Sequence, residues 1–352
     1  MQVDFEHRSP RSDDVIRLGM VDLEDGLRWI DLDESRAWCW QQGCMLQWRP
    51  GSETEIMWND REGEHFVGRI LDVRTGVKRT LPIPFYTVSP DGLTALSTDF
   101  RRIQDMRPGY GYPGVTDPNK DVFAPKDSGI YKLSCDSGEY ELVLTIDQIV
   151  HDIVSPNVKK ETKHYFNHLL FNTDGSRFTF LHRWRNSNRS LSTRMITASP
   201  NGNDVRVIDD YGHTSHFVWR DKQHILAWSW HPSNGPGFYL YQDGSPDVMA
   251  VGGGIMTSNG HCSYLPGTEW ILNDTYPDTD HRNQQLYLYQ DSSRDIRVIG
   301  QFHSPNLYSG EWRCDLHPRY SPDGHYVVFD STHEGYGRQM YIVDVRDITN
   351  SF

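Results

Sequence analysis

One pattern recurs along this chain at intervals that constrain its fold more than any other feature. A strand-like run of aromatic and β-branched residues enters a tight turn, often with glycine, and continues as a second such run. The copies open at residues 45–51, 86–92, 168–175, 216–221, 261–267 and 317–324. Repeats of about 40–50 residues with four strand signals each are typical of a β-propeller, because each sheet buries its faces only between neighbouring sheets. The sequence therefore predicts an all-β chain with a propeller fold.

The number of blades depends on how the start of the chain is used. We expect one domain over residues 1–352, since repetitive all-β folds of this length often form a single unit. Six repeats are visible, and residues 1–36 carry only weak strand signals, which fit either a partial blade or a closing strand. A seventh blade would combine residues 1–36 with the strand-like run 340–345.

Composition argues against several classes of partner and location. The net charge of −13 disfavours nucleic acid, which needs a basic surface. A mean hydropathy of −0.65, without an apolar run of about eighteen residues, argues against a membrane protein. The five cysteines are odd in number and scattered, as in a reducing compartment. Residues 1–8 lack the profile of a secretory signal, so we expect a cytoplasmic protein, or a periplasmic one if a leader has been removed. The oligomeric state cannot be read from the sequence.

A histidine occupies the same place in four successive copies, just ahead of the first strand-like run. These residues are His168, His216, His261 and His317. The first strands of propeller blades line the central channel, so equivalent positions in successive blades surround its axis. We therefore expect the four imidazoles to converge on a shared site, although any one of them alone would more often be a packed or exposed side chain.

A carboxylate accompanies the last of these histidines. Asp315 and His317 are two residues apart on a predicted strand, which places both side chains on one face of the sheet. The following residues 321–324, Ser-Pro-Asp-Gly, predict the turn of a hairpin. An aspartate and a histidine on one face can bind one divalent cation such as Mn²⁺, Ca²⁺ or Zn²⁺.

From about residue 164 to residue 345 the chain resembles the oligogalacturonate lyases, seven-bladed propellers that cleave short pectin oligosaccharides by β-elimination. The resemblance favours seven blades here. It implies that His216, within Ser-His-Phe-Val-Trp, is the catalytic base. It also implies that Arg194, within Thr-Arg-Met-Ile, faces the substrate carboxylate.

The same resemblance implies a manganese site, with one departure from the family pattern. The family holds the ion with a histidine that matches His261 and with a His-Pro-His-Pro strand preceded by glutamine. His317 matches the second histidine of that strand, whereas Asp315 stands at the first and Trp312 at the glutamine. Glu311 is the nearest substitute for the glutamine. We expect Mn²⁺, with Ca²⁺ or Zn²⁺ as alternatives, and the aspartate hints at a substrate other than oligogalacturonate.

The chemistry also follows from the residues. Eliminating a 4-linked uronate requires removal of the proton on C5, next to a carboxylate whose charge opposes formation of the enolate. A divalent cation and an arginine neutralise that carboxylate, most strongly in a pocket with little water. A neutral imidazole, with a reference pKa of about 6.5, can then take the proton near neutral pH.

Further side chains are candidates for binding the acidic sugar. Arg183 and Arg185 follow the third repeat in the run His-Arg-Trp-Arg, although an exposed blade edge explains them equally well. Tyr110, in a Gly/Pro/Tyr-rich insertion, could cover a sugar face, although such loops more often contribute packing. His168 would lie in the pocket wall or add a ligand.

The sequence leaves other functions open. One is a propeller lyase or glycoside hydrolase for another uronate polymer, with the same pocket. Another is a non-catalytic propeller of the TolB or WD type that binds protein partners, in which the histidines only stabilise the channel. The sequence contains no Walker loop, no GxSxG and no GxGxxG motif, so phosphoryl transfer, serine hydrolysis and dinucleotide binding lack support.

Overall fold

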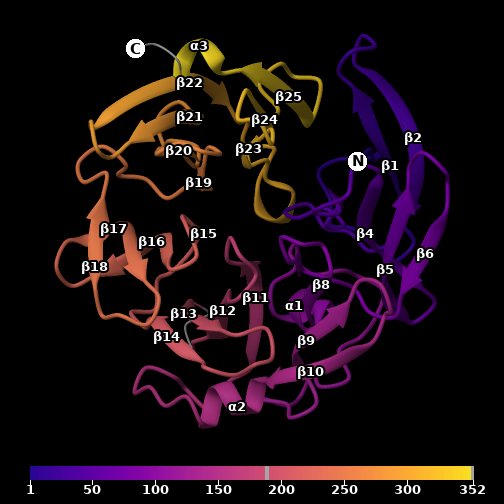
Figure 1. Ribbon diagram of the computed structural model, residues 1–352, viewed down its shortest axis with the longest axis vertical. Helices are drawn as coiled ribbons and strands as arrows, with labels where there is room; N and C mark the ends of the chain where they lie inside the picture. The colour runs from indigo at the N-terminus through magenta and orange to yellow at the C-terminus, as the bar shows by residue number, and fades with distance from the viewer. Residues whose placement is uncertain (187–189, 350–352) are drawn as a thin grey trace. The chain divides into compact units, whose positions relative to one another are not determined.

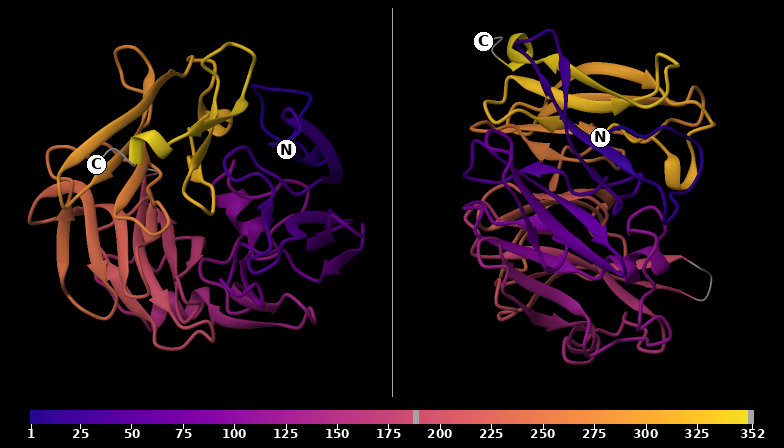
Figure 2. Two further views of the ribbon diagram at one scale, coloured as in Figure 1. Left: turned by 45° about the horizontal axis from the view of Figure 1, so that its top comes forward. Right: turned by 90° about the vertical axis from the view of Figure 1, so that its right-hand side faces the viewer.

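The computed structural model describes residues 1–186 and 190–349. Consecutive sheets of antiparallel strands follow one another along the sequence (Figure 1). Figure 2 shows the same succession of hairpins from two further directions. Six of the described sheets have three or four strands and correspond to the six repeats. The prediction of an all-β chain with a propeller fold is therefore confirmed.

The chain forms two compact units. The first comprises Met1–Ser192 and Ile196–Val205, and the second comprises Thr193–Met195 and Arg206–Phe352. Each unit has hydrophobic clusters of its own. A single domain over residues 1–352 stays a prediction.

The first unit opens with a two-stranded sheet of β1 (Ile16–Asp22) and β2 (Arg28–Ser35). The next sheet contains β3 (Gln47–Trp48), β4 (Glu55–Glu62), β5 (His65–Asp72) and β6 (Lys78–Leu81). It is followed by β7 (Thr87–Val88), β8 (Thr94–Thr98), β9 (Gly129–Ser134) and β10 (Tyr140–Thr145). The sheet after that has the order β11 (His164–Phe171), β12 (Phe178–Arg185), β13 (Leu191–Ala198) and β14 (Arg206–Asp209). Of this sheet, Thr193–Met195 within β13 and all of β14 belong to the second unit.

The second unit contains three further sheets. One consists of β15 (Phe217–Trp219), β16 (His224–His231), β17 (Gly235–Gln242) and β18 (Val248–Val251). The next consists of β19 (Ser263–Tyr264), β20 (Trp270–Asp274), β21 (Asn283–Gln290) and β22 (Asp295–His303). The last has β23 (Arg319–Tyr320), β24 (Tyr326–Ser331) and β25 (Gln339–Asp344).

Residues 1–36 form a two-stranded sheet, and its role as a partial blade or a closing strand stays a prediction. Among the described strands β1 pairs with β2, and Arg17 of β1 also forms a bridge with Gln2. β25, the run predicted at 340–345, pairs with β24. Six blade-like sheets are therefore observed, and a seventh full blade is not confirmed.

Helical segments are short. They are α1 (Phe100–Met106), α2 (Ile146–His151), η1 (Gly310–Trp312) and α3 (Arg346–Thr349). Asp99 and Thr145 cap α1 and α2 by accepting hydrogen bonds from backbone N–H groups of the first turn. Among the described residues, no helix combines the length and the apolar character needed to cross a membrane.

Strand β20 explains how neighbouring sheets of the second unit stabilise one another. Its consecutive side chains point to opposite faces of the sheet. Ile271 lies in one cluster with Leu226 of β16, and Leu272 lies in another with Val327 of β24. Both faces of this sheet are thus buried, which is why the strand is apolar without alternation.

The Ser-Pro-Asp-Gly turns have one internal network in two repeats. In residues 321–324 the Asp323 carboxylate accepts hydrogen bonds from the Ser321 hydroxyl and the His325 N–H, and the Ser321 hydroxyl accepts one from the Tyr326 N–H. Residues 89–92 repeat these bonds. The glycine of each turn has φ +72°, a left-handed conformation that glycine adopts without strain. The predicted hairpin between β23 and β24 is confirmed.

Alanine substitutions at the two turn glycines distinguish the cost of a positive φ from the cost of a steric clash. In Gly324→Ala the added Cβ has an ordinary contact at 3.5 Å, so we expect a loss of about 1 kcal/mol in the free energy of unfolding from the positive φ alone. In Gly92→Ala the Cβ would lie 2.1 Å from the carbonyl oxygen of Pro50, and we expect a loss nearer to about 3 kcal/mol. Chemical denaturation of both variants checks this. Equal losses would contradict it.

Candidate metal centre and active site

Three predicted ligands come together in the second unit. The donor atoms of His261, Asp315 and His317 all lie within 4.8 Å of one another. Asp315 is buried, with 2% of its surface exposed, and the two histidines are half-buried. Ligand atoms that bind one ion at about 2.0–2.2 Å are at most about 4.4 Å apart, so a small movement brings these three within range of a common ion.

A buried carboxylate holds two of these ligands in place. Asp274, the last residue of β20, is 1% exposed and accepts hydrogen bonds from the N–H of His261 at 2.6 Å and the N–H of His317 at 3.2 Å. Its two oxygens also lie 3.0 and 2.9 Å from Nδ1 of His261. Nδ1 therefore carries the proton, which leaves the Nε2 lone pair of His261 for an ion.

Sequence reasoning missed Asp274. Its signal was an acidic residue at the end of the apolar run Trp-Ile-Leu-Asn-Asp, where a charge needs a specific partner. Gly260 permits the close approach, because a Cβ at that position would lie 1.8 Å from the carbonyl oxygen of Asp274.

His317 reaches the cluster by a route that the sequence did not indicate. Asp315 and His317 lie in an irregular segment before β23, and His317 has φ +43°. The prediction that the two share one strand is therefore wrong, because strand alternation does not apply to a left-handed residue. Their convergence holds all the same. Burial, followed by the neighbouring His261, lowers the pKa of His317 well below its ordinary value. The imidazole is thus neutral at pH 7, the form that binds metals.

Asp315 carries an ion pair of its own. Nε of Arg313 lies 2.8 Å from Oδ2 of Asp315, and the aspartate side chain is 2% exposed. The carboxylate is therefore oriented without a metal. Glu311, the possible substitute for the family's glutamine, is not part of the donor cluster found among the described residues. The ring N–H of Trp312 donates to the carbonyl of Leu307 at 3.0 Å.

The predicted base stands next to the predicted ligands. The ring centroid of His216 lies 4.1 Å from that of His261, which lies 4.2 Å from that of His317. Nδ1 of His216 is 3.0 Å from Oδ1 of Asn259, and the amide of Asn259 donates to the Ser215 hydroxyl at 3.2 Å. With Oδ1 as the acceptor, Nδ1 of His216 carries the proton and Nε2 is the basic nitrogen.

Arg194 belongs to the same unit and is fully buried. Burial lowers the pKa of Arg194 to about 10, although the negative charge of Asp210 acts to raise it. The guanidinium is therefore still charged at pH 7. That it faces a substrate carboxylate beside His216 stays a prediction.

The remaining predicted residues lie in the first unit. Tyr110 is buried, and its ring lies 6.0 Å from that of half-buried His168. Arg183 is buried on β12. Arg185 donates to the carbonyl of Met106 and lines a pocket together with Lys159. Of the four histidines predicted to converge, those in the second unit have neighbouring rings, and a site shared by all four stays a prediction.

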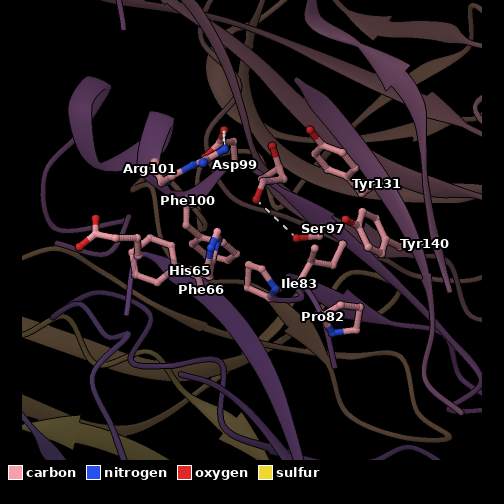
Figure 3. A pocket seen from close by; sticks show the side chains of 13 residues that line it. His65, Phe66, Pro82, Ile83, Ser97, Asp99, Phe100, Arg101, Tyr131 and Tyr140 are labelled. Carbon is pink, nitrogen blue, oxygen red and sulfur yellow. Dashed lines mark hydrogen bonds and ion pairs between the residues drawn. The ribbon is translucent and has the colours of Figure 1, made fainter. Parts of the chain in front are cut away.

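The first unit also contains a pocket that no predicted residue lines. It has a volume of about 240 Å³ and lies beside Pro82, Tyr131 and Tyr140 (Figure 3). The rings of Tyr131 and Tyr140 are 6.4 Å apart. Its charged pair, Asp99 and Arg101, is joined by hydrogen bonds at 2.8 Å, so neither group is available to a ligand without breaking them.

The donor set fits a divalent cation. Two imidazole nitrogens and one carboxylate oxygen suit manganese or zinc better than calcium, which prefers oxygen ligands. The carboxylate behind His261 is the outer partner that metal-binding histidines usually have.

No protein-family model and no curated protein matches this chain. Solved structures do. The oligogalacturonate lyase of Vibrio parahaemolyticus is similar over 95% of this chain and 99% of that chain, with a TM-score of 0.59 and 14% identity. An oligogalacturonate lyase in complex with manganese is similar over 94% of this chain and 96% of that chain, with a TM-score of 0.54 and 11% identity. The fold is shared with oligogalacturonate lyases.

Other propellers match as well. Tricorn protease is similar over 97% of this chain, with a TM-score of 0.60 and 11% identity, but the match spans only 33% of that protein. At such identities these likenesses show the fold, and the fold is used by proteins with different functions. The resemblance stated from the sequence is supported at the level of fold.

The role of Asp274 can be measured as metal affinity. We expect Asp274→Asn to weaken Mn²⁺ binding about 10–100-fold, because the variant loses the charge that orients His261 and keeps the shape of the side chain. Isothermal titration calorimetry measures this. Asp243→Asn is the matched control, since its buried carboxylate binds Arg206 in the same unit. Unchanged affinity in Asp274→Asn would contradict the assignment.

Proposed function

We propose that this protein is a metal-dependent lyase that cleaves a short uronic-acid-containing oligosaccharide by β-elimination. One observation carries the proposal: the donor atoms of His261, Asp315 and His317 gather within 4.8 Å, and the His216 ring lies 4.1 Å from that of His261. A possible base therefore stands beside a possible cation. The fold likeness to an oligogalacturonate lyase in complex with manganese supports both the reaction and the first choice of metal.

His261, Asp315 and His317 would hold the cation, and Mn²⁺ is the expected one. When bound, the ion supplies positive charge that neutralises a uronate carboxylate and favours removal of the neighbouring proton. The chain prepares this site by keeping His317 neutral and by binding Nδ1 of His261 to Asp274.

The proton transfer is assigned to His216. The Oδ1 atom of Asn259 accepts a hydrogen bond from Nδ1–H of His216, so Nε2 of His216 takes the proton from C5 of the sugar. The C5–H bond and the C4–O bond break, and a C4–C5 double bond forms. The departing sugar oxygen takes a proton from water and becomes a hydroxyl, and His216 returns its proton to the solvent. Arg194, which stays charged in its buried position, is the proposed partner of the substrate carboxylate.

Asp315 bears on the identity of the substrate. Its carboxylate adds a negative charge to the cluster, and Arg313 compensates part of it at 2.8 Å. We therefore expect a uronate whose linkage or neighbouring sugar differs from that of oligogalacturonate, and an assay needs both galacturonate and glucuronate oligomers.

His216→Ala tests the base. We expect the rate at which a conjugated 4,5-unsaturated uronate appears, followed by ultraviolet absorbance, to fall about 10²–10⁴-fold because the proton acceptor is lost. His325→Ala is the matched control, since this histidine is exposed and pairs with Asp323. Equal rates in the two variants would exclude His216 as the base. New reducing ends without the chromophore would indicate hydrolysis instead.

Removal of the metal tests the cation separately. We expect a chelator to abolish the absorbance change and added Mn²⁺ to restore it, because without the ion the uronate carboxylate keeps its full opposing charge. His261→Ala should not recover at Mn²⁺ concentrations that restore the unsubstituted protein. Full activity in chelator would remove the metal from the proposal, and the absence of a melting-temperature change with any acidic sugar would favour a binding platform.

A further inference from the structure

A buried arginine of the first unit lacks a carboxylate partner. Arg183 is 4% exposed, and its Nε and Nη1 atoms have no hydrogen-bond partner. Burial, followed by the charge of Arg107, lowers the pKa of Arg183, and the groups that counter this are the hydroxyls of Tyr165 and Tyr110. An uncompensated charge in such a place is costly, so its presence needs an explanation.

The other buried arginine of this unit shows what a paired site looks like. Arg102 is 1% exposed and bonds to Asp117 at 3.2 Å and to the carbonyl of Asn119 at 3.0 Å. It also donates to the carbonyls of Val122 and Phe123. The chain has 48 acidic residues, yet none of those described forms an ion pair with Arg183 or Arg107.

The neighbours of Arg183 form a coherent cluster. Tyr165 on β11 pairs directly with Arg183 on β12, so their side chains leave the same face of the sheet. Asn167 lies two residues further along that face, is fully buried, and its Nδ2 and Oδ1 atoms have no hydrogen-bond partner. A donor and an acceptor thus accompany the guanidinium.

The outer side of this cluster carries a second cation and a histidine. Arg107 is half-buried, lies 4.1 Å from the ring centroid of Tyr110 and donates to the Tyr110 hydroxyl at 3.2 Å. His168 sits at a β-bulge of β11 with φ +52°, and its ring is 6.0 Å from that of Tyr110. Bulges commonly redirect a side chain toward a site.

We propose that Arg183, Asn167, Arg107 and His168 form an anion-binding site of the first unit that takes the carboxylate of an acidic sugar. Arg183 binds the carboxylate, because a planar guanidinium matches its two oxygens. The Asn167 amide can form hydrogen bonds with a sugar hydroxyl next to the carboxylate. The rings of Tyr165 and Tyr110 provide an apolar surface against which the sugar packs. The anion site follows from these residues, whereas the choice of an acidic sugar rests on the proposed function. Every residue lies in the first unit, and the test requires no turnover, so failure of this inference and failure of the lyase activity are distinguishable.

The test compares melting temperatures of the whole chain in chelator, so that the metal centre contributes no carboxylate binding. Galacturonate and glucuronate are the probes, with glucose as the neutral control. We expect the uronates to raise the melting temperature of the unsubstituted protein and glucose to leave it unchanged. In Arg183→Met we expect the ligand-free melting temperature to stay equal or rise, because an uncompensated charge is removed, and the uronate-induced rise to disappear.

Arg69→Met is the matched control. It also removes one positive charge from the first unit, but Arg69 pairs with Asp60 and Glu62. We expect a lower ligand-free melting temperature and an unchanged uronate-induced rise. A drop in Arg183→Met as large as that in Arg69→Met, or a uronate-induced rise that persists in Arg183→Met, would overturn the proposal.

Two further measurements separate the alternatives. If Arg183→Met does not fold, Arg183→Lys is the second variant, because it keeps the charge but lacks the planar guanidinium. We expect its uronate affinity, measured by calorimetry, to fall at least about tenfold. An affinity equal to that of the unsubstituted protein would overturn the proposal. A rise with sulfate or phosphate as large as that with uronate overturns the assignment to carboxylates. His261→Ala should keep the uronate-induced rise, which distinguishes this site from the proposed active site.

Discussion

The proposed metal centre depends on one carboxylate. Asp274 ends a buried strand and binds the backbone of both His261 and His317, so a single charge positions two loops that are more than fifty residues apart. It also selects the tautomer of His261 through Nδ1. Because the group is 1% exposed, these hydrogen bonds tie both segments to one buried carboxylate, and this makes the arrangement specific.

Charge is distributed differently in the two units. In the second unit the carboxylate of Asp315 is matched by Arg313 and the imidazole of His317 is kept neutral, so the cluster is prepared for a cation. In the first unit Arg183 and Arg107 form no ion pair with the carboxylates that the structure describes, which is the basis for the proposed anion site. A net charge of −13 therefore says little about local sites, since burial and neighbours decide the potential there.

The likeness to known propellers limits what the fold can say about function. Oligogalacturonate lyases and tricorn protease match this chain about equally well. Sheets that bury their faces against each other need only apolar residues at regular intervals along their strands, and many different sequences meet this requirement. The site is more restrictive, because a neutral imidazole, an oriented base and a buried carboxylate must meet within a few ångströms, and only particular residues allow this.

Repeat spacing and turn chemistry were sufficient to predict the sheets, the hairpin at residues 321–324 and the register of the histidines, because these depend on local pattern. His216, His261 and His317 were found for that reason. Asp274 and the left-handed backbone of His317 were not, since contacts between segments distant in sequence produce them. The lack of a carboxylate partner for Arg183 among the described residues is likewise a tertiary property. The sequence shows the arginine, but only packing decides which carboxylates stay out of reach.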